Sequence, residues 1–257
     1  MPTYNATGIT LGAHKYGDAA RVVTFFTRER GKVEATARGI GKPGSKLAAA
    51  VEPFTLSRLQ FAEGRDLDRL TQAEVLQGYV PLRQDMRRYA YGAALLELTA
   101  LTTEPGQAVP DLFEALVAAL AALAGATDLE LIFWAYTLRL LQTQGNAPEI
   151  EHCVHCGARI TGQVWHLAVE GGFVCRDCSP QSNGRAQVSG AAVGALRGLV
   201  TLPFDRLDRL SLSQGVRREV GRVIRAHLSY HVSGELRSLA FLDKVSRAKG
   251  RSDADLS

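Results

Sequence analysis

The sequence predicts an α+β fold in which an N-terminal β-barrel precedes a helical bundle with an embedded metal-binding module. Polar and apolar residues alternate with the period of a β-strand over about the first eighty residues, and apolar residues then recur with a helical period. The only four cysteines form two Cys-x-x-Cys pairs between helical segments. A chain of 257 residues, 46% hydrophobic and 22% charged, is long enough to bury more than one core.

These patterns divide the chain into five segments. We expect a nucleic-acid-binding barrel, the first part of a helical domain, a four-cysteine module, the second part of the helical domain and a disordered polar tail. The expected bounds, in that order, are residues 1–80, 81–149, 150–185, 186–243 and 244–257.

The barrel is expected to contain five short strands with glycine-rich corners. In the third strand, residues 32–40, the small apolar side chains Val33 and Ala35 point to one side, while Lys32 and Arg38 point to the other. Five such strands favour a small barrel of the OB type, which binds oligonucleotides on one face. The other four strands are expected at residues 7–14, 22–27, 54–61 and 68–76.

Helical periodicity begins after residue 81. A helix over residues 129–145 is apolar on nearly every side, so we expect it at the buried centre of the bundle. In the last helix, His227 and His231 lie on the apolar face without the glutamate of a His-Glu-x-x-His motif, so we interpret them as packing residues. The other helices are expected at residues 85–103, 110–125, 189–200 and 213–232.

The two cysteine pairs are Cys153 with Cys156 and Cys175 with Cys178, separated by eighteen residues. This spacing is typical of a structural zinc site, because four thiolates complete a tetrahedral shell and leave no position for a reactive water. Two disulfides and four unrelated thiols are the alternatives. No Gly-x-Ser-x-Gly motif and no phosphate-binding loop is present, so we expect no enzyme.

The net charge of +4 is unevenly distributed along the chain. Residues 15–46 hold eight Lys/Arg against three Asp/Glu, residues 81–150 hold four against eight, and residues 197–251 hold twelve against five. Two basic blocks therefore flank an acidic middle, which favours a polyanionic partner such as DNA over a merely solvated surface. No signal peptide and no membrane-spanning run is evident, so we expect a cytoplasmic protein.

The basic residues of the barrel are candidates for contacts with a DNA backbone, whereas few aromatic residues are available to stack on bases. Tyr16, Phe25 and Phe26 are the aromatic candidates, and the two phenylalanines are expected in the core. A second basic face on the last helix either contacts DNA or keeps the helix soluble. The candidates are Arg30, Lys32, Arg38, Lys42 and Lys46 on the barrel and Arg217, Arg218, Arg222 and Arg225 on the helix.

The order of several segments resembles the RecO family of bacterial recombination mediators. The resemblance covers nearly the whole chain. It is carried by Ile9–Leu11, Tyr16–Asp18, Arg21–Thr27, Gly31–Lys32, Ala37–Gly39, Glu52–Phe54, the two Cys-x-x-Cys pairs, Leu228 with His231, and Leu236–Ser238.

The resemblance implies an OB-fold, a helical bundle and a zinc module in a non-enzymatic protein of the nucleoid. Its implied activities are binding of single- and double-stranded DNA, annealing of complementary strands and help in loading RecA onto DNA coated with single-strand binding protein. Its implied partners are RecR and the acidic C-terminal tail of single-strand binding protein. It implies DNA contacts at Arg21, Lys32 and Arg38, to which we add Arg30, Lys42 and Lys46. The alternative is a zinc-stabilised scaffold for protein interactions with no direct role on DNA.

Overall fold

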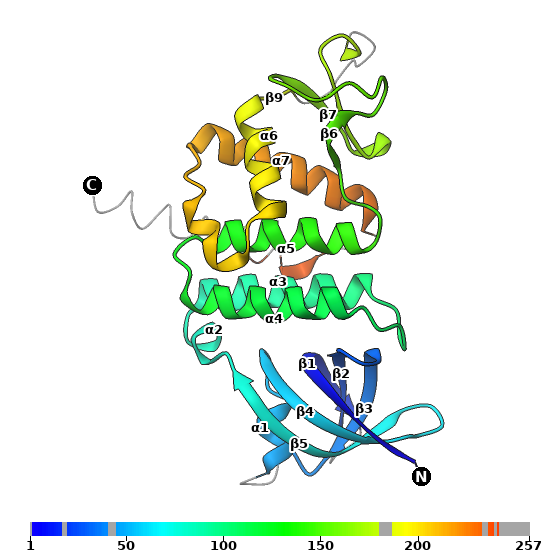
Figure 1. Ribbon diagram of the computed structural model, residues 1–257. Coiled ribbons are helices and arrows are strands. Elements are labelled where there is room, and N and C mark those ends of the chain that lie inside the picture. Colours follow the sequence, from blue (N-terminus) through cyan, green and yellow to red (C-terminus); the bar gives the residue numbers. More distant parts are fainter. Residues whose placement is uncertain are drawn as a thin grey trace, which may run out of the picture. The chain divides into compact units, whose positions relative to one another are not determined.

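The computed structural model of the chain (Figure 1) comprises two compact units. The first unit is formed by Met1–Gly125 with Glu235–Ser257, and the second by Ala126–Gly234. The structure describes residues 2–16, 20–40, 45–179, 187–232, 236–238 and 241. The segment 244–257, which we expect to be disordered, lies outside the described residues.

The first unit begins with a closed five-stranded barrel, which confirms the expected fold class. The strand order is β1-β2-β3-β5-β4, with antiparallel neighbours except for the parallel pair of β3 and β5 that closes the barrel. A short helix, α1 (Lys46–Ala50), connects β3 to β4. The strands are β1 (Thr3–Tyr16), β2 (Ala20–Thr27), β3 (Gly31–Arg38), β4 (Thr55–Ala62) and β5 (Asp68–Gly78).

The barrel core follows the alternation of the sequence. Buried and more exposed residues alternate along β3, as expected from the small apolar side chains of this strand. Phe25 of β2 contacts Phe61 of β4 edge to face inside the barrel, with 5.6 Å between ring centroids. Ala50 and Val51, at the end of α1, belong to the same core. The helix therefore helps to fill the interior that the strands enclose.

Three helices complete the described core of the first unit: α2 (Val80–Gln84), α3 (Met86–Thr102) and α4 (Pro110–Gly125). Asp85 caps α3, because its side chain accepts a hydrogen bond of 2.8 Å from the Arg88 N–H. The barrel packs on α3 through Phe54, a fully buried residue with φ of +60°. Its ring lies against Gly92, where a Cβ atom would come within 2.8 Å of the Phe54 ring.

The second unit is built around α5 (Leu129–Thr143), which is buried along most of its length, as expected for the centre of the bundle (Figure 1). The helices α6 (Gly190–Thr201) and α7 (Gln214–His231) pack against it. Gly221 of α7 faces the indole of Trp134. A four-stranded sheet of order β6-β8-β7-β9 carries the cysteines. Its strands are β6 (Glu149–Cys153), β7 (Val164–Leu167), β8 (Gly172–Val174) and β9 (Gln187–Val188), and 3-10 turns span Ala168–Glu170 (η1) and Phe204–Arg209 (η3).

No helix in the part of the chain that the structure describes is long and apolar enough to cross a membrane.

Substitution of Gly92 by alanine tests how the barrel is attached to α3. We expect Gly92→Ala to lower the free energy of unfolding of the first unit by about 1–3 kcal/mol, because the new methyl group overpacks the Phe54 ring. The measurement is urea unfolding followed by circular dichroism, since both tryptophans lie in the second unit.

Gly194→Ala is the matched control for this substitution. Gly194 lies within α6, and nothing surrounds its Cβ position within 4 Å. Alanine is favoured over glycine in a helix by about 1 kcal/mol, so this variant should be as stable as the parent or more stable. A Gly92→Ala variant that gains stability to the same extent would contradict the proposed close contact.

Candidate nucleic-acid interface and metal centre

The four cysteines meet because two parallel neighbouring strands deliver them. Cys153 ends β6, and Cys175 directly follows β8, its partner in the sheet. The Val154 N–H donates to the Phe173 carbonyl at 3.0 Å, which holds the turn of the first pair against β8. All four sulfur atoms lie within 4.8 Å of one another, as a shared metal ion requires. The expected cysteine cluster is confirmed, and none of its members is in a disulfide.

The electrostatics of the cluster suit a bound cation. Burial alone would raise the pKa of the Cys153 thiol, but backbone N–H groups of Cys175, Cys156 and His155 together lower it to about 6. Hydrogen bonds with the sulfurs of Cys156 and Cys175 raise the pKa of Cys178 to about 12. Four adjacent thiolates would thus repel one another, so the four thiols do not all lose their protons. A bound dication would offset this repulsion and favour the deprotonated form.

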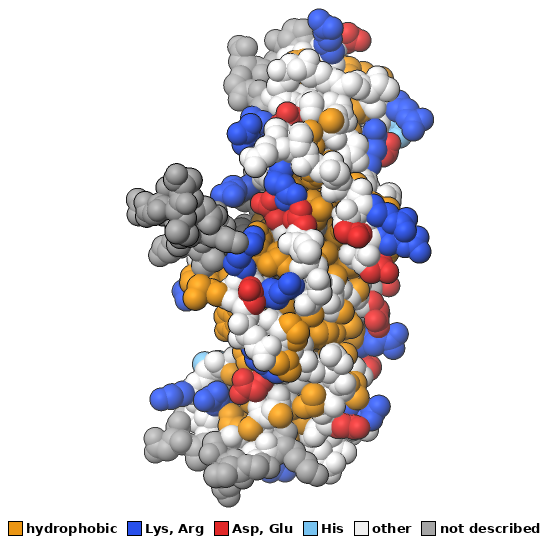
Figure 2. Space-filling view, turned by 90° about the vertical axis from the view of Figure 1, so that its left-hand side faces the viewer, with side chains coloured by type: hydrophobic (Ala, Val, Ile, Leu, Met, Phe, Trp, Pro, Cys, Tyr) orange, Lys and Arg blue, Asp and Glu red, His pale blue; other side chains and the backbone are white. Residues whose placement is uncertain are grey.

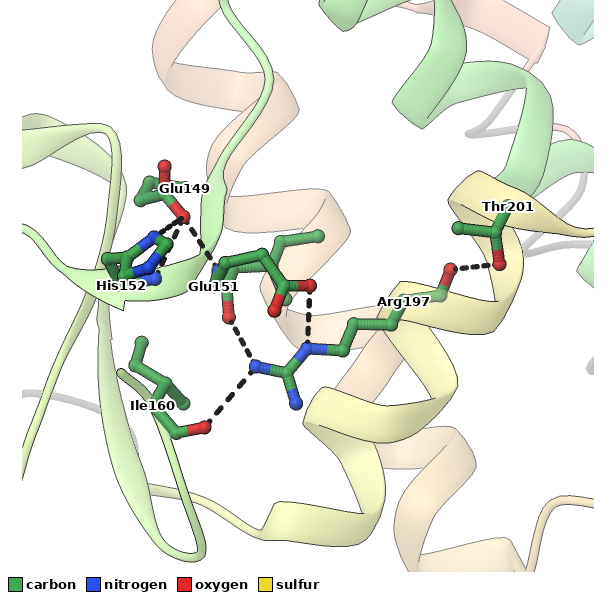
Figure 3. A network of polar contacts seen from close by, with 7 residues as sticks. Glu149, Glu151, His152, Ile160, Arg197 and Thr201 are labelled. Carbon is green, nitrogen blue, oxygen red and sulfur yellow. Dashed lines mark hydrogen bonds and ion pairs between the residues drawn. The ribbon is translucent and has the colours of Figure 1, made fainter. Parts of the chain in front are cut away.

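A charged side chain from α6 anchors the cysteine module (Figure 3). The Arg197 Nε donates to the Glu151 carboxylate at 2.8 Å. Its Nη2 donates to the carbonyls of Ile150 at 3.1 Å and Ile160 at 3.3 Å, which lie on either side of the first cysteine pair. Glu149 accepts from the backbone N–H of Glu151 at 2.6 Å, so the start of β6 is fixed as well. One guanidinium therefore fixes both chain segments that flank the first pair of thiolates.

A pair of histidines makes a second connection between the module and the bundle. The ring nitrogens His166 Nε2, on β7, and His227 Nδ1, on α7, are 3.4 Å apart. His227 Nε2 donates to the Asn146 carbonyl at 2.7 Å, so its Nδ1 accepts the proton of His166. The ring of His231 packs on His227 with 4.4 Å between centroids. His227 is thus buried and the half-buried His231 packs on it, in line with our interpretation of the last helix.

The basic residues of the barrel do not gather on one face. Arg38 pairs with Ala20 in the register of β2 and β3, whereas Arg21 pairs with Ala37, so the two arginines point to opposite sides of the sheet. The Lys32 Nζ donates to the Ala100 carbonyl at 3.0 Å, near the C-terminal end of α3. Lys32 therefore contributes to the packing of the barrel on this helix.

Arg30 is also engaged within the first unit. Its guanidinium lies 3.7 Å from the centroid of the Tyr4 ring and pairs with Glu63 at 3.2 Å. Lys42 lies outside the described residues, and Lys46 is the first residue of α1. Phe25 and Phe26 are fully buried, as expected for core residues.

Barrel closure brings together exposed residues that sequence reasoning did not connect. Tyr16, Ala20 and Arg38 form one cross-strand row, and His14, Val22, Thr36 and Arg69 form the next row on the same face. Tyr16 is 54% exposed, and His14, Arg38 and Arg69 are exposed. We call His14, Tyr16, Arg38 and Arg69 the Tyr16 surface. Arg69 lies on β5 and joins this surface because β5 pairs with β3 in parallel. In the sequence, only the alternation of residues along its strand could have indicated to which side of the sheet Arg69 points.

The arginines of α7 divide into two groups. Arg217 donates to both oxygens of Asp128 and, at 2.8 Å, to Glu130, and its hydrogen bonds with Asp128 raise the pKa of its guanidinium. It joins the start of α7 to the start of α5. Arg218 and Arg222 are exposed and, with Arg225, line a pocket of about 590 Å³ beside Trp134. On the face seen in Figure 2, positive and negative side chains are interspersed with exposed hydrophobic ones.

Comparison with known proteins confirms the resemblance in the sequence. Residues 1–79 match the family described as Recombination protein O N terminal, and residues 83–240 match Recombination protein O C terminal. The DNA repair protein RecO of Pelotomaculum thermopropionicum is 32% identical over 254 residues, which are 99% of each chain. The proteins of the same name from Frankia casuarinae and Cutibacterium acnes are 35% and 34% identical over 95% of this chain and 100% of their own length.

We expect the histidine pair to make the stability of the second unit depend on pH. Burial and the neighbouring His227 lower the pKa of His166 to about 4, whereas an unfolded histidine titrates near 6.5. A depressed folded pKa means that the stabilisation is present above pH 6.5 and is lost as pH falls toward 4. We expect the second unit to lose about 3 kcal/mol of unfolding free energy between pH 7 and pH 4 through this group.

The measurement is urea unfolding followed by tryptophan fluorescence at several pH values. His166→Gln is the control, because its amide can still donate to His227 but does not titrate. The fall in stability should be smaller in this variant. If the free energy of unfolding falls equally in the parent protein and in His166→Gln, groups other than His166 cause the acid sensitivity.

Proposed function

The chain belongs to the Recombination protein O family, and on this basis we propose that it is a non-enzymatic DNA-binding protein of DNA repair and homologous recombination. It binds single- and double-stranded DNA, anneals complementary strands and helps to load RecA onto DNA coated with single-strand binding protein. It acts in the cytoplasm, on the nucleoid. RecR and the acidic tail of single-strand binding protein are its protein partners.

The Tyr16 surface is the observation that carries the DNA-binding proposal. It combines a half-exposed tyrosine with Arg38 and Arg69 on adjacent rows of one sheet face. An aromatic ring can stack on a base of any identity, and cations beside it can follow the phosphates. An OB-type barrel presents such a face to a single strand. Binding at this surface depends on the backbone and on stacking, and is therefore independent of sequence.

In this proposal, some of the predicted residues contact DNA and the others stabilise the first unit. Arg38 contacts DNA on the Tyr16 surface, and Arg21, beside Lys15 across the β1–β2 pair, contacts it from the opposite side of the sheet. Lys42 and Lys46 follow β3 in the sequence and stay predicted DNA contacts. Arg30 and Lys32 act mainly on the stability of the first unit, because their charged groups already have partners there.

Substitutions on the Tyr16 surface test this proposal. We expect Arg38→Ala and Arg69→Ala each to weaken binding to a single-stranded oligonucleotide and to reduce the slope of log affinity against log salt by about 0.7. Tyr16→Ala should cost about 1–3 kcal/mol of binding free energy and leave the salt slope unchanged, because stacking releases no counterions. Fluorescence anisotropy over a series of salt concentrations measures both quantities.

Arg58→Ala is the matched control for these variants. Arg58 is an exposed arginine of β4 in the same barrel, and its guanidinium pairs with Glu74 at 2.5 Å. We expect this variant to bind like the parent protein. If Arg58→Ala weakens binding as much as Arg38→Ala, the Tyr16 surface is not the binding face.

The arginine pocket of α7 is the second basic face of the proposal. Arg218, Arg222 and Arg225 surround a hollow beside the Trp134 ring, so positive charge adjoins apolar surface. This combination suits an anionic partner, either a second DNA strand or an acidic peptide. Arg217 takes part through its ion pairs with Asp128 and Glu130, which hold α7 against α5.

We assign a structural Zn²⁺ to the four cysteines, because thiolates are soft ligands and four of them close a tetrahedral shell. A strong chelator should remove one metal ion per chain and loosen the module, since zinc binding is coupled to folding. Trp165 packs against the small core that contains Cys153, so its fluorescence should change on removal of the metal. Elemental analysis identifies the metal. Unchanged fluorescence and thermal stability after removal would contradict a structural role.

The alternative function is a zinc-stabilised scaffold that binds proteins and has no direct role on DNA. It is favoured by Arg30 and Lys32, two of the predicted DNA contacts, because both have partners within the first unit. If the protein is such a scaffold, the parent protein and all barrel variants should bind and anneal DNA equally poorly. The leading proposal predicts that the parent protein anneals complementary strands coated with single-strand binding protein, and that Arg38→Ala slows this annealing.

A further inference from the structure

The four thiols of the metal centre differ in their access to solvent. Cys153 is 3% exposed, because it lies in the small core formed with Leu167 and Val174. Cys156 is exposed, and Cys175 and Cys178 are half-buried. A small oxidant in water therefore reaches Cys156 first and Cys153 last. Because a shared zinc ion holds all four sulfurs as thiolates, exposure decides which of them is oxidised first.

The exposed thiol has a partner on the neighbouring strand. The Sγ atoms of Cys156 and Cys175 are 3.7 Å apart, whereas a disulfide needs about 2.05 Å. Cys156 lies in the turn after β6, and Cys175 follows β8, which is paired with β6. The sheet thus holds the two sulfurs in van der Waals contact. The sulfur of Cys153 instead accepts the Cys175 N–H at 3.4 Å from the buried side.

We propose that Cys156 and Cys175 form a peroxide-sensitive modification site within the metal centre. The inference rests on the zinc assignment made above. The Cys156 thiolate attacks hydrogen peroxide, which breaks the O–O bond, gives a sulfenic acid and releases hydroxide. The Cys175 thiolate then attacks this sulfur, a disulfide forms and a second hydroxide leaves. Two protons from solvent convert the two hydroxides into water, so peroxide is reduced by two electrons and two thiolates are oxidised.

The disulfide leaves Cys153 and Cys178 as the only thiolates of the site. Two ligands do not complete a tetrahedral shell, so the module no longer retains its metal ion. The connections through Arg197 and the His166–His227 pair stay intact, because they involve no cysteine. Oxidation therefore changes the turn around Cys156 and leaves the attachment of the module to α6 and α7 in place. Reduction by a thiol in the presence of zinc restores the site.

The experiment uses the full chain loaded with zinc, since substitution of a ligand would itself loosen the module. Hydrogen peroxide is added, zinc release is followed with a chromogenic chelator, and disulfides are located by mass spectrometry of non-reduced peptides. The chain contains no cysteines other than these four, so every thiol signal comes from the module. We expect loss of one zinc ion per chain, formation of the Cys156–Cys175 disulfide, and recovery of both after reduction.

A dimedone probe added early in the reaction traps the sulfenic acid and should label Cys156 in preference to Cys153. Three outcomes would overturn the proposal: retention of zinc under peroxide, early labelling of Cys153, or disulfides confined within each Cys-x-x-Cys pair. Elemental analysis before oxidation tests the zinc assignment separately. If the protein lacks zinc, the zinc assignment fails. Disulfide mapping after peroxide treatment of the reduced, metal-free protein then still tests whether Cys156 pairs with Cys175.

Discussion

The short parallel pair of β3 and β5 is the constraint on which the first unit depends. It joins Ala35 to Asp68 and Thr36 to Arg69, and so closes a sheet whose other pairs are antiparallel. Side chains support the closure, because the hydroxyl of Tyr4 donates to the Asp68 carboxylate and that of Thr36 donates to the Asp68 carbonyl. Burial and Asp68 raise the pKa of Tyr4, which keeps this hydroxyl protonated as a donor. Closure both seals the barrel core and brings Arg69 beside the row of Arg38.

The attachment of the barrel to α3 explains why some cations of the barrel are structural. Phe54 adopts a left-handed backbone conformation, which costs about 1–3 kcal/mol, and its burial against Gly92 offsets this cost. Lys32 approaches the end of the same helix and donates to a carbonyl that has no partner within the helix. A positive charge on a strand next to a helix C-terminus is thus used for packing. The exposed Arg38 lies at the other end of β3.

In the second unit, the contacts that position the cysteine module are separate from the cysteine cluster itself. Arg197 and the histidine pair attach the sheet to α6 and α7, and the four thiolates close its interior. A site that is fixed from two sides can lose its ion without losing its place in the unit. Cys156 is exposed and Cys153 is buried, so the same cluster has an exposed side and a protected side. A structural metal and a peroxide-sensitive thiol pair are therefore compatible in one centre.

Local pattern alone determined much of this protein: the barrel strands, the buried α5 and the cysteine cluster. Each depends on periodicity or spacing within about twenty residues, which the chain order records directly. Tertiary structure decided which cations have partners, because the partners of Lys32, Arg30 and Arg217 lie 68, 33 and 89 residues away along the chain. It also placed Arg69 near Arg38, through a register that only barrel closure sets. Charge in a sequence indicates a polyanionic partner, but the pairing of each charge is a long-range property of the fold.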